Sequence, residues 1–333
     1  RLSVMSMRTI ISRSAFLLCA FLCVAQIAAA QEAAQGQMSD KEMKIKCGIN
    51  VSDFFSYQIT FNTTAKRYFP HSDIPSVYTR QLTYFFTELV DSIGNDGIAT
   101  IEVNVDSIRI DTKAAQVETH FNSQDNKSLA VVDLRNPELV GTTMILNKGF
   151  TFRMTLAGDF IDYTGWDMWL AMIDTTVEID SASKFADKEY MSRDFVRTLV
   201  LTSAGFVYDK TYLDLQHWNQ AMSRLVFKTP VIDSAACHIE IAPSHKEAVA
   251  FFDGKLYPDL REKTIREHGY ADSATVDSLT GVTRDTMMLT DRGIVHFRSN
   301  GSTMKMYVHA GKVSYSESVD EAIELKLLAY ERR

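Results

Sequence analysis

Cysteine is scarce in this chain, at 4 of 333 residues. Cys19 and Cys23 lie inside an apolar run near the N-terminus, and each follows a leucine, whereas bacterial lipidation needs a small residue before the cysteine. A lipid anchor is therefore not expected. The other two, Cys47 and Cys237, form a disulfide or remain two separate buried thiols. Both alternatives stay open because the sequence does not give the distance between their Cα atoms.

Recognisable catalytic and metal-binding motifs are missing. The chain has no Gly-x-Ser-x-Gly elbow, no Gly-x-Gly-x-x-Gly or Walker-type loop, no His-Glu-x-x-His and no Cys-x-x-Cys. His238, Glu240 and His245 lie close in sequence, but Pro243 directs the third side chain elsewhere. We therefore expect no catalytic residue, no metal and no cofactor.

The chain also lacks an excess of positive charge and any further long apolar run. The net charge is −7 at pH 7, and removal of the first 30 residues, with three arginines and no acidic residue, would make it −10. An acidic surface repels nucleic acid and anionic lipid. No later stretch reaches the roughly 20 apolar residues of a membrane-spanning helix. We expect neither a nucleic-acid partner nor a transmembrane segment in the mature chain.

The N-terminus has the pattern of a secretory signal. Two arginines after Met7 precede the apolar run Ala15–Ala25, and the small residues Ala28–Ala30 follow. A charged region, an apolar region and an Ala-x-Ala site, in that order, predict export and cleavage near Ala30. We expect a signal peptide over residues 1–30 and a periplasmic or extracellular location. The polar residues 31–46 are interpreted as a flexible lead-in.

Period-two alternation dominates the start of the mature chain. Apolar and polar residues alternate clearly over Ile98–Ile110, and Gly94–Gly97 has the composition of a tight turn. This pattern predicts an antiparallel hairpin with one solvated face. A second hairpin is predicted over Phe150–Tyr163, with its turn at Ala157–Asp159. Near the C-terminus, Asn300-Gly301 between alternating segments predicts another hairpin turn.

The middle of the chain favours helices. Trp166–Ile173 and Phe185–Gly205 have helical apolar spacing, and Ser244 and Glu247 have the spacing of a capping box. Leu260–His268 is predicted as a further short helix. One more amphipathic stripe consists of Leu215, Trp218, Met222 and Leu225.

These elements predict an α+β fold for residues 47–333, as a single β-rich domain. A strongly curved, mainly antiparallel sheet would combine the N- and C-terminal segments, with a helical insertion at about residues 166–269 packed against it. Two separate small sheets are the alternative. A single sheet is favoured because it hides strand edges that otherwise invite aggregation.

The segment Phe150–Asp167 contains a strand, a Gly turn, a second strand and a Gly that opens a helix. With the Ile98–Ile110 strand, the leader, the chain length and the Asn300-Gly301 turn, it resembles a family of uncharacterised secreted bacterial β-rich proteins, known only as a domain of unknown function. The resemblance implies an exported fold of this kind. It implies no catalytic residue that could be transferred to this chain.

An aromatic group is the main candidate for ligand binding. Phe160, Tyr163, Trp166 and Trp169 cluster at the predicted hairpin-to-helix junction, and Trp218 lies on a later predicted helix. Such a group can line a site for an apolar or glycan ligand. The alternative is a role in the hydrophobic core, where each large side chain contributes about 1.5–3 kcal/mol by burial.

The leading interpretation is a non-enzymatic envelope protein that binds a partner or serves as a structural accessory. The first alternative is a periplasmic carrier of a hydrophobic ligand, in a β cavity lidded by helices, which predicts an apolar pocket with few polar groups. The second is a hydrolase whose site is not recognisable from sequence, near His217 or His238, with converging groups of perturbed pKa. The partner, an apolar small molecule or an envelope protein, is left open.

Overall fold

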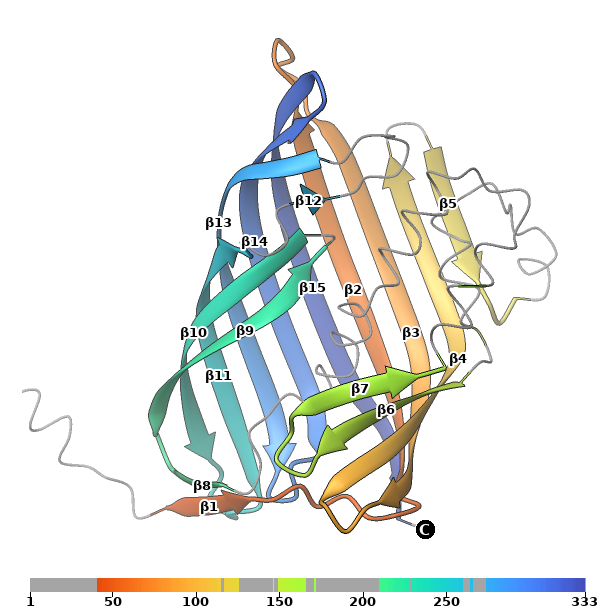
Figure 1. The fold of residues 1–333 in the computed structure, drawn as a ribbon, viewed down its shortest axis with the longest axis vertical. Helices are drawn as coiled ribbons and strands as arrows, with labels where there is room; N and C mark the ends of the chain where they lie inside the picture. The colour runs from red at the N-terminus through yellow and green to blue at the C-terminus, as the bar shows by residue number, and fades with distance from the viewer. Residues whose placement is uncertain are drawn as a thin grey trace, which may run out of the picture. The chain divides into compact units, whose positions relative to one another are not determined.

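The computed structural model describes residues 41–114, 117–125, 146, 149–165, 171, 210–227, 229–259, 264–265 and 274–332 (Figure 1). The chain divides into the units Arg1–Lys41 and Glu42–Arg333, and the description concerns the second. Within these residues, no helix is long and apolar enough to cross a membrane.

Every secondary-structure element formed by the described residues is a strand. The strands are β1 (Glu42–Ile45), β2 (Phe54–Tyr68), β3 (Ser76–Ile93), β4 (Ile98–Ala114), β5 (Val117–Asn122), β6 (Gly149–Thr155), β7 (Phe160–Thr164), β8 (Lys210–Leu213), β9 (His217–Val226), β10 (Thr229–Ile241), β11 (Glu247–Pro258), β12 (Thr264–Ile265), β13 (Ala274–Thr290), β14 (Val295–Ala310) and β15 (Val313–Glu331).

One 13-stranded sheet contains all of these strands except β1 and β8, which pair with each other. Its main path is β7-β6-β4-β3-β2-β15-β14-β13-β11-β10-β9, while β5 pairs with β4 and β12 with β13. Within the sheet all strand pairs are antiparallel, and the first long strand, β2, pairs with the last, β15. The prediction that alternating runs from both ends of the chain share one sheet is therefore confirmed.

The predicted helical middle section is wrong for the described residues. Residues 217–226, 229–241 and 247–258 form the long strands β9, β10 and β11. Trp218, Gln220, Met222 and Arg224 point to the same, inner face of β9. Because Gln220 and Arg224 are polar, the apolar residues of this strand do not alternate regularly. Their spacing therefore resembled that of a helix. The predicted helices Trp166–Ile173, except for residue 171, and Phe185–Gly205 lie outside the described residues.

The residues with capping-box spacing form a turn between strands. Glu247 is the first residue of β11, and the Ala242 N–H donates to the Glu247 carbonyl oxygen at 2.9 Å. The predicted helix Leu260–His268 lies outside the described residues apart from Thr264–Ile265, which is the strand β12.

Two of the three predicted hairpin turns are confirmed. Gly94–Gly97 joins β3 to β4, and Ala157–Asp159 joins β6 to β7, with positive φ at Gly97 (75°) and Gly158 (98°). The Asn300-Gly301 turn is wrong, because both residues lie inside β14. The chain turns instead around Gly311, at φ 58°, after a much longer strand.

Alternation along the long strands gives the sheet a buried inner face and an exposed outer face. Apolar inner side chains form two clusters, a larger one around Ile59, Tyr84 and Phe152 and a smaller one around Met304 and Val319. In Figure 1, β9 and β10 cross in front of β14 and β15, and side-chain contacts described below join the same strands. The sheet therefore curls over its own inner face.

Candidate functional site

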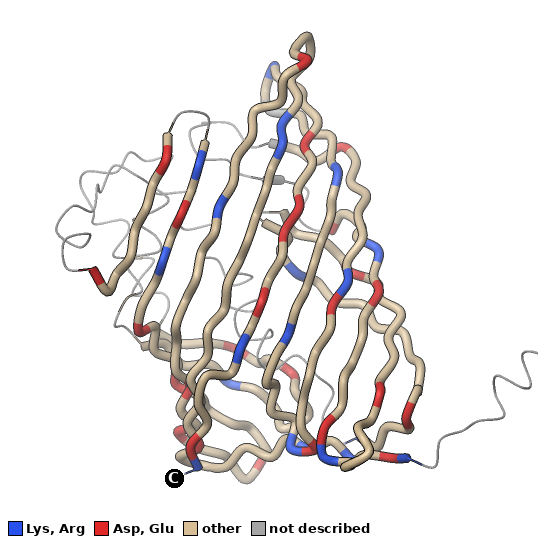
Figure 2. The backbone as a smooth tube through the Cα atoms, turned by 180° about the vertical axis from the view of Figure 1, so that it is seen from behind, with Lys and Arg blue, Asp and Glu red and all other residues tan. Residues whose placement is uncertain are grey.

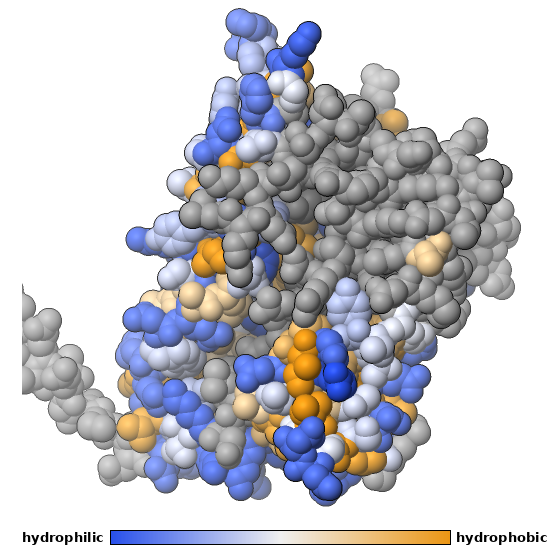
Figure 3. Space-filling model, in the orientation of Figure 1, coloured by the Kyte–Doolittle hydropathy of each residue, from blue (hydrophilic) through white to orange (hydrophobic). Residues whose placement is uncertain are grey.

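The described members of the predicted aromatic group lie on the first and last strands of the main path, β7 and β9, and all three pack against the larger hydrophobic cluster. Phe160 and Tyr163 lie on β7 with ring centroids 6.4 Å apart, and apolar surface gathers over β6 and β7 in Figure 3. Trp218 lies on β9, at the other end of the sheet, and packs against Tyr212 and Phe252 at 5.5 and 6.2 Å. Trp166 and Trp169 lie outside the described residues. A shared ligand for the whole group stays a prediction.

Both mature-chain cysteines are free thiols in the structure, Cys47 half-buried and Cys237 buried. Burial raises the pKa of the Cys47 thiol and raises that of Cys237 to about 12. Because the thiolate is the reactive form, neither environment has the character of a nucleophile site.

A groove of about 1050 Å³ lies on the outer face of the sheet, and we name it the polar groove. It crosses eight neighbouring strands, from β11 to β5. Three consecutive residues from each of seven strands line it, with two more from β5. The contributing residues are 253–255, 282–284, 301–303, 320–322, 62–64, 79–81 and 111–113, followed by Glu118 and His120.

The pairing register of the strands brings these residues side by side. In each triplet the outer two side chains face solvent, and the central residue turns its side chain to the inner face. The central residues are direct cross-strand partners, so they form one unbroken row across the sheet. In order, this row is Gly254, Thr283, Ser302, Glu321, Thr63, Arg80 and Thr112.

The middle of the polar groove carries amide and hydroxyl groups. The Gln81 amide donates to the Asn62 side-chain oxygen at 2.8 Å, and the Thr303 hydroxyl donates to Asp320 at 2.9 Å. Gly301 is exposed at the groove floor, and a Cβ added there would meet no atom within 4 Å. The floor is thus open at its centre.

Each end of the polar groove holds charges of both signs. On β4 and β5, His120 Nδ1 lies 2.7 Å from Asp111 Oδ1, and Lys113 Nζ lies 2.5 Å from Glu118 Oε1. These contacts raise the pKa of His120 and lower that of Glu118. On β11 and β13, Arg284 Nε lies 3.8 Å from Asp253 Oδ1. Figure 2 shows both signs distributed along these strands.

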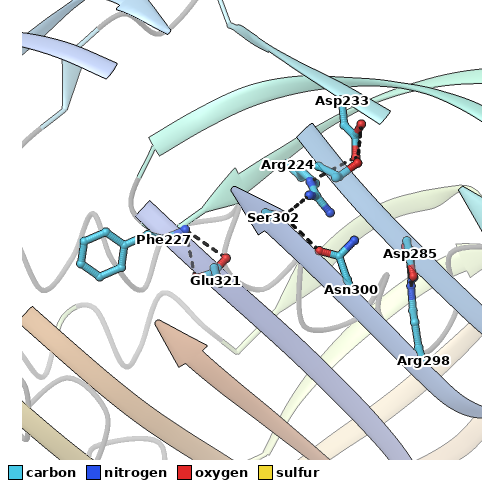
Figure 4. Close-up of polar contacts among 9 residues, drawn as sticks. Arg224, Phe227, Asp233, Asp285, Arg298, Asn300, Ser302 and Glu321 are labelled. Atoms are coloured by element: carbon cyan, nitrogen blue, oxygen red, sulfur yellow. Dashed lines mark hydrogen bonds and ion pairs between the residues drawn. The ribbon is translucent and has the colours of Figure 1, made fainter. Parts of the chain in front are cut away.

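Beneath the groove, on the inner face, lies a buried charge network (Figure 4). Arg298 on β14 donates three hydrogen bonds to the Asp285 carboxylate on β13, at 2.6–3.1 Å, and both side chains are less than 10% exposed. Arg224 on β9 reaches across to Ser302 on β14 at 2.6 Å and to Asp233 at 3.4 Å. The network therefore ties the curled-over β9 and β10 to the strands under the groove.

The Glu321 side chain on β15 accepts hydrogen bonds from the backbone directly after β9. Both of its carboxylate oxygens accept from the Phe227 N–H at 3.1 Å, and Oε2 also accepts from Thr63 at 3.3 Å. Burial outweighs these bonds and the nearby Arg80 and Arg224, and it raises the pKa of Glu321 above its ordinary value of 4.5.

A pH prediction follows for Glu321. Because its folded-state pKa lies above the unfolded-state value, its contribution to stability is complete below pH 4.5 and is lost as pH rises through the folded-state pKa. The variant Glu321→Gln is expected to lose this dependence. Chemical denaturation of both proteins from pH 4 to pH 8 should show the wild type falling relative to the variant. A difference that stays constant or moves the other way contradicts the assignment.

Sequence reasoning did not identify the groove or the network. The triplets are separated by up to 258 residues between their central residues, Thr63 and Glu321, and only the register of the sheet brings them together. The available signal was polar residues at inward positions of otherwise alternating strands, such as Arg298 and Asn300.

Comparison with known proteins assigns this chain to no family. No family model and no curated protein matches the chain. Among solved structures it is similar to lipovitellin, in a structure concerned with lipid–protein interactions, with a TM-score of 0.47, 9% identity and coverage of 85% of this chain and 26% of that one. The chain thus spans about a quarter of that protein.

Two further similarities are weaker. The translocator domain of the autotransporter NalP from Neisseria meningitidis gives a TM-score of 0.20 at 8% identity, covering 92% of this chain and 97% of that one. A BenF-like porin from Pseudomonas fluorescens Pf-5 gives 0.19 at 8%, covering 84% and 100%. The class of the described part is thus defined by its own architecture, a large antiparallel sheet, and we infer no function from these similarities.

Proposed function

We propose that this protein is an exported, non-enzymatic binding protein that holds an extended oligosaccharide in the polar groove. The observation that carries the proposal is one groove of about 1050 Å³ to which eight neighbouring strands contribute hydrogen-bonding side chains. At about 4.8 Å between strands, these eight strands span about 34 Å. The exported location rests on the leader pattern before Gln31.

The side chains that line the polar groove indicate which kind of ligand it can bind. Amide, hydroxyl, carboxylate and basic side chains hydrogen-bond sugar hydroxyls, and they surround the neutral centre at Gly301 and Ala322. The first alternative, a hydrophobic carrier, needs a pocket lined mainly by hydrophobic and aromatic side chains. Among the described residues that line the polar groove, only Val282 and Ala322 carry apolar side chains.

A peptide or a nucleic acid fits the polar groove less well. Peptides that add to a sheet use the free backbone groups of an edge strand, whereas this groove crosses the face of paired strands. Single-stranded nucleic acid needs a positive groove with stacking aromatic rings. The described residues that line the groove carry both charge signs and include no Phe, Tyr or Trp.

The variant Gly301→Ile tests the proposal, because it places a branched side chain at the open centre of the groove floor. A β-branched residue suits a strand, so folding should be maintained. Binding of neutral and zwitterionic oligosaccharides of graded length, screened on an array and titrated by calorimetry, should weaken by about tenfold or more, equivalent to about 1.4 kcal/mol.

Ser299→Ile is the matched control. Ser299 is exposed on the same face of β14, two residues away, and does not line the groove. It should bind like the wild type. The proposal is abandoned if the wild type binds no oligosaccharide, if Gly301→Ile binds as tightly as Ser299→Ile, or if a protein partner alone occupies the groove.

A further inference from the structure

A second hollow, of about 390 Å³, lies where β10, β11, β13 and β14 approach their turns, and we name it the apolar pocket. Its walls are mainly hydrocarbon, and it shares no lining residue with the polar groove. Met288 is 46% exposed here, on the outer face of β13. The apolar wall residues are Ile241, Ala242, Pro243, Ala248, Val249, Met288 and Leu289.

Two irregularities of the sheet border this pocket. Met288 pairs with Phe297 and Leu289 with Val295, so His296 is the extra residue of a β-bulge on β14. Bulges redirect side chains, and His296 is exposed and lines the pocket. The opposite border is the β10–β11 turn, closed by the Ala242–Glu247 hydrogen bond.

The charge at the rim has one sign. Glu240 and Glu247 line the pocket, and no lysine or arginine is found among its described lining residues. Glu240 is the cross-strand partner of Val249, which in turn pairs with Met288. The Glu240 carboxylate therefore lies next to two apolar residues on neighbouring strands. His238 also lies near this carboxylate, with its Nε2 4.0 Å from Glu240 Oε1.

We propose that the apolar pocket binds a small amphipathic organic cation. Its hydrocarbon body would contact Val249 and Met288, and its ammonium group would face Glu240 and Glu247. Apolar walls supply the binding free energy by removal of hydrocarbon from water. The two carboxylates select the sign of the charge, since like charges placed at the rim are disfavoured. This site is independent of the polar groove, so failure of the oligosaccharide proposal leaves it intact.

Hexylammonium is a suitable probe, with hexanoate and hexanol as ligands of similar length but different charge. Titrations of the full chain at low ionic strength, followed by NMR shifts of the Met288 methyl group, should give the order hexylammonium, hexanol, hexanoate. Glu240→Gln and Glu247→Gln should each weaken hexylammonium about fivefold, as expected for loss of one partly solvated charge contact. Added salt should reduce that difference.

Glu102→Gln is the control, because Glu102 is an exposed carboxylate on β4 away from the pocket, and it should leave the affinity unchanged. Gly301→Ile should also bind hexylammonium like the wild type. The proposal is overturned if hexylammonium shows no saturable binding, if hexanoate binds equally well, or if neither Glu240→Gln nor Glu247→Gln alters the affinity.

Discussion

Replacement of Asp285 by alanine is expected to lower the free energy of unfolding by about 3–5 kcal/mol, the usual cost of removing one partner of a buried ion pair. Asp285 accepts three hydrogen bonds from Arg298, and both side chains are almost fully buried. Alanine would leave the guanidinium without the carboxylate that faces it. Urea denaturation followed by circular dichroism measures the loss.

The exposed pair Arg153–Asp162 provides the control. It also joins neighbouring antiparallel strands, β6 and β7, but its side chains are 46% and 39% exposed. Solvent screens such a pair, so Asp162→Ala should cost far less stability than Asp285→Ala. Equal losses in the two variants would mean that burial of the Asp285–Arg298 pair has no energetic consequence.

The double replacement Asp285→Leu with Arg298→Met separates packing from charge. Both positions then hold apolar side chains of similar volume, and the buried charges are gone. Such replacements are often neutral or stabilising by about 1–4 kcal/mol. The double variant should therefore recover most of the loss seen with Asp285→Ala. If it does not, the network contributes more than mutual neutralisation of charge.

The sheet could be predicted from sequence wherever its inner face is apolar. Ile101, Val103 and Val105 alternate cleanly with polar residues, and the predicted strand Ile98–Ile110 lies within β4. The turns at Gly97 and Gly158 could also be predicted, because glycine there supplies the positive φ that the hairpins need.

Prediction failed where the buried charge network interrupts the apolar alternation. Arg224 on β9 and Asn300 on β14 occupy inward positions that a simple strand pattern fills with hydrocarbon. A helical period then fitted β9 better, and Asn300-Gly301 resembled a turn. Asn300 is in fact buried and accepts from Ser302 at 3.2 Å. Arg224 has its partners on β14 and β10, and no local pattern reveals contacts between strands so far apart in sequence.

The polar groove could not be predicted for a related reason. Each triplet that lines it, such as Asn62–Thr64 or Gly301–Thr303, is an ordinary polar segment of a strand. Only the register of eight strands aligns the triplets, and register depends on the whole sheet.

One hydrogen bond of the buried charge network requires a glycine at position 254. Thr283 on β13 donates to both Asp233 oxygens on β10, at 3.1 and 3.0 Å, although β11 lies between these two strands. The contact passes over Gly254, where a Cβ would lie 2.0 Å from Asp233 Oδ1 and 2.4 Å from Thr283 Oγ1. Only glycine leaves room for this bond across the intervening strand.

Gly254→Ala is therefore expected to destabilise the protein by about 3–5 kcal/mol. Overpacking costs about 1–3 kcal/mol, and loss of a buried hydrogen bond to a charged group costs about 1.5–3 kcal/mol. Gly301→Ala should instead stabilise by about 0.5–1 kcal/mol, because glycine weakens a strand and a Cβ meets nothing there. Guanidinium denaturation compares the two.

Asp233→Ala combined with Gly254→Ala locates the origin of the effect. The first change removes the carboxylate that collides with the new methyl group, so the combined loss should be smaller than the sum of the two single losses. Coupled neighbours typically show interaction energies of about 0.5–3 kcal/mol. Strict additivity would mean that the methyl group disturbs the backbone rather than the Asp233–Thr283 bond, and that Gly254 is not required for the buried charge network.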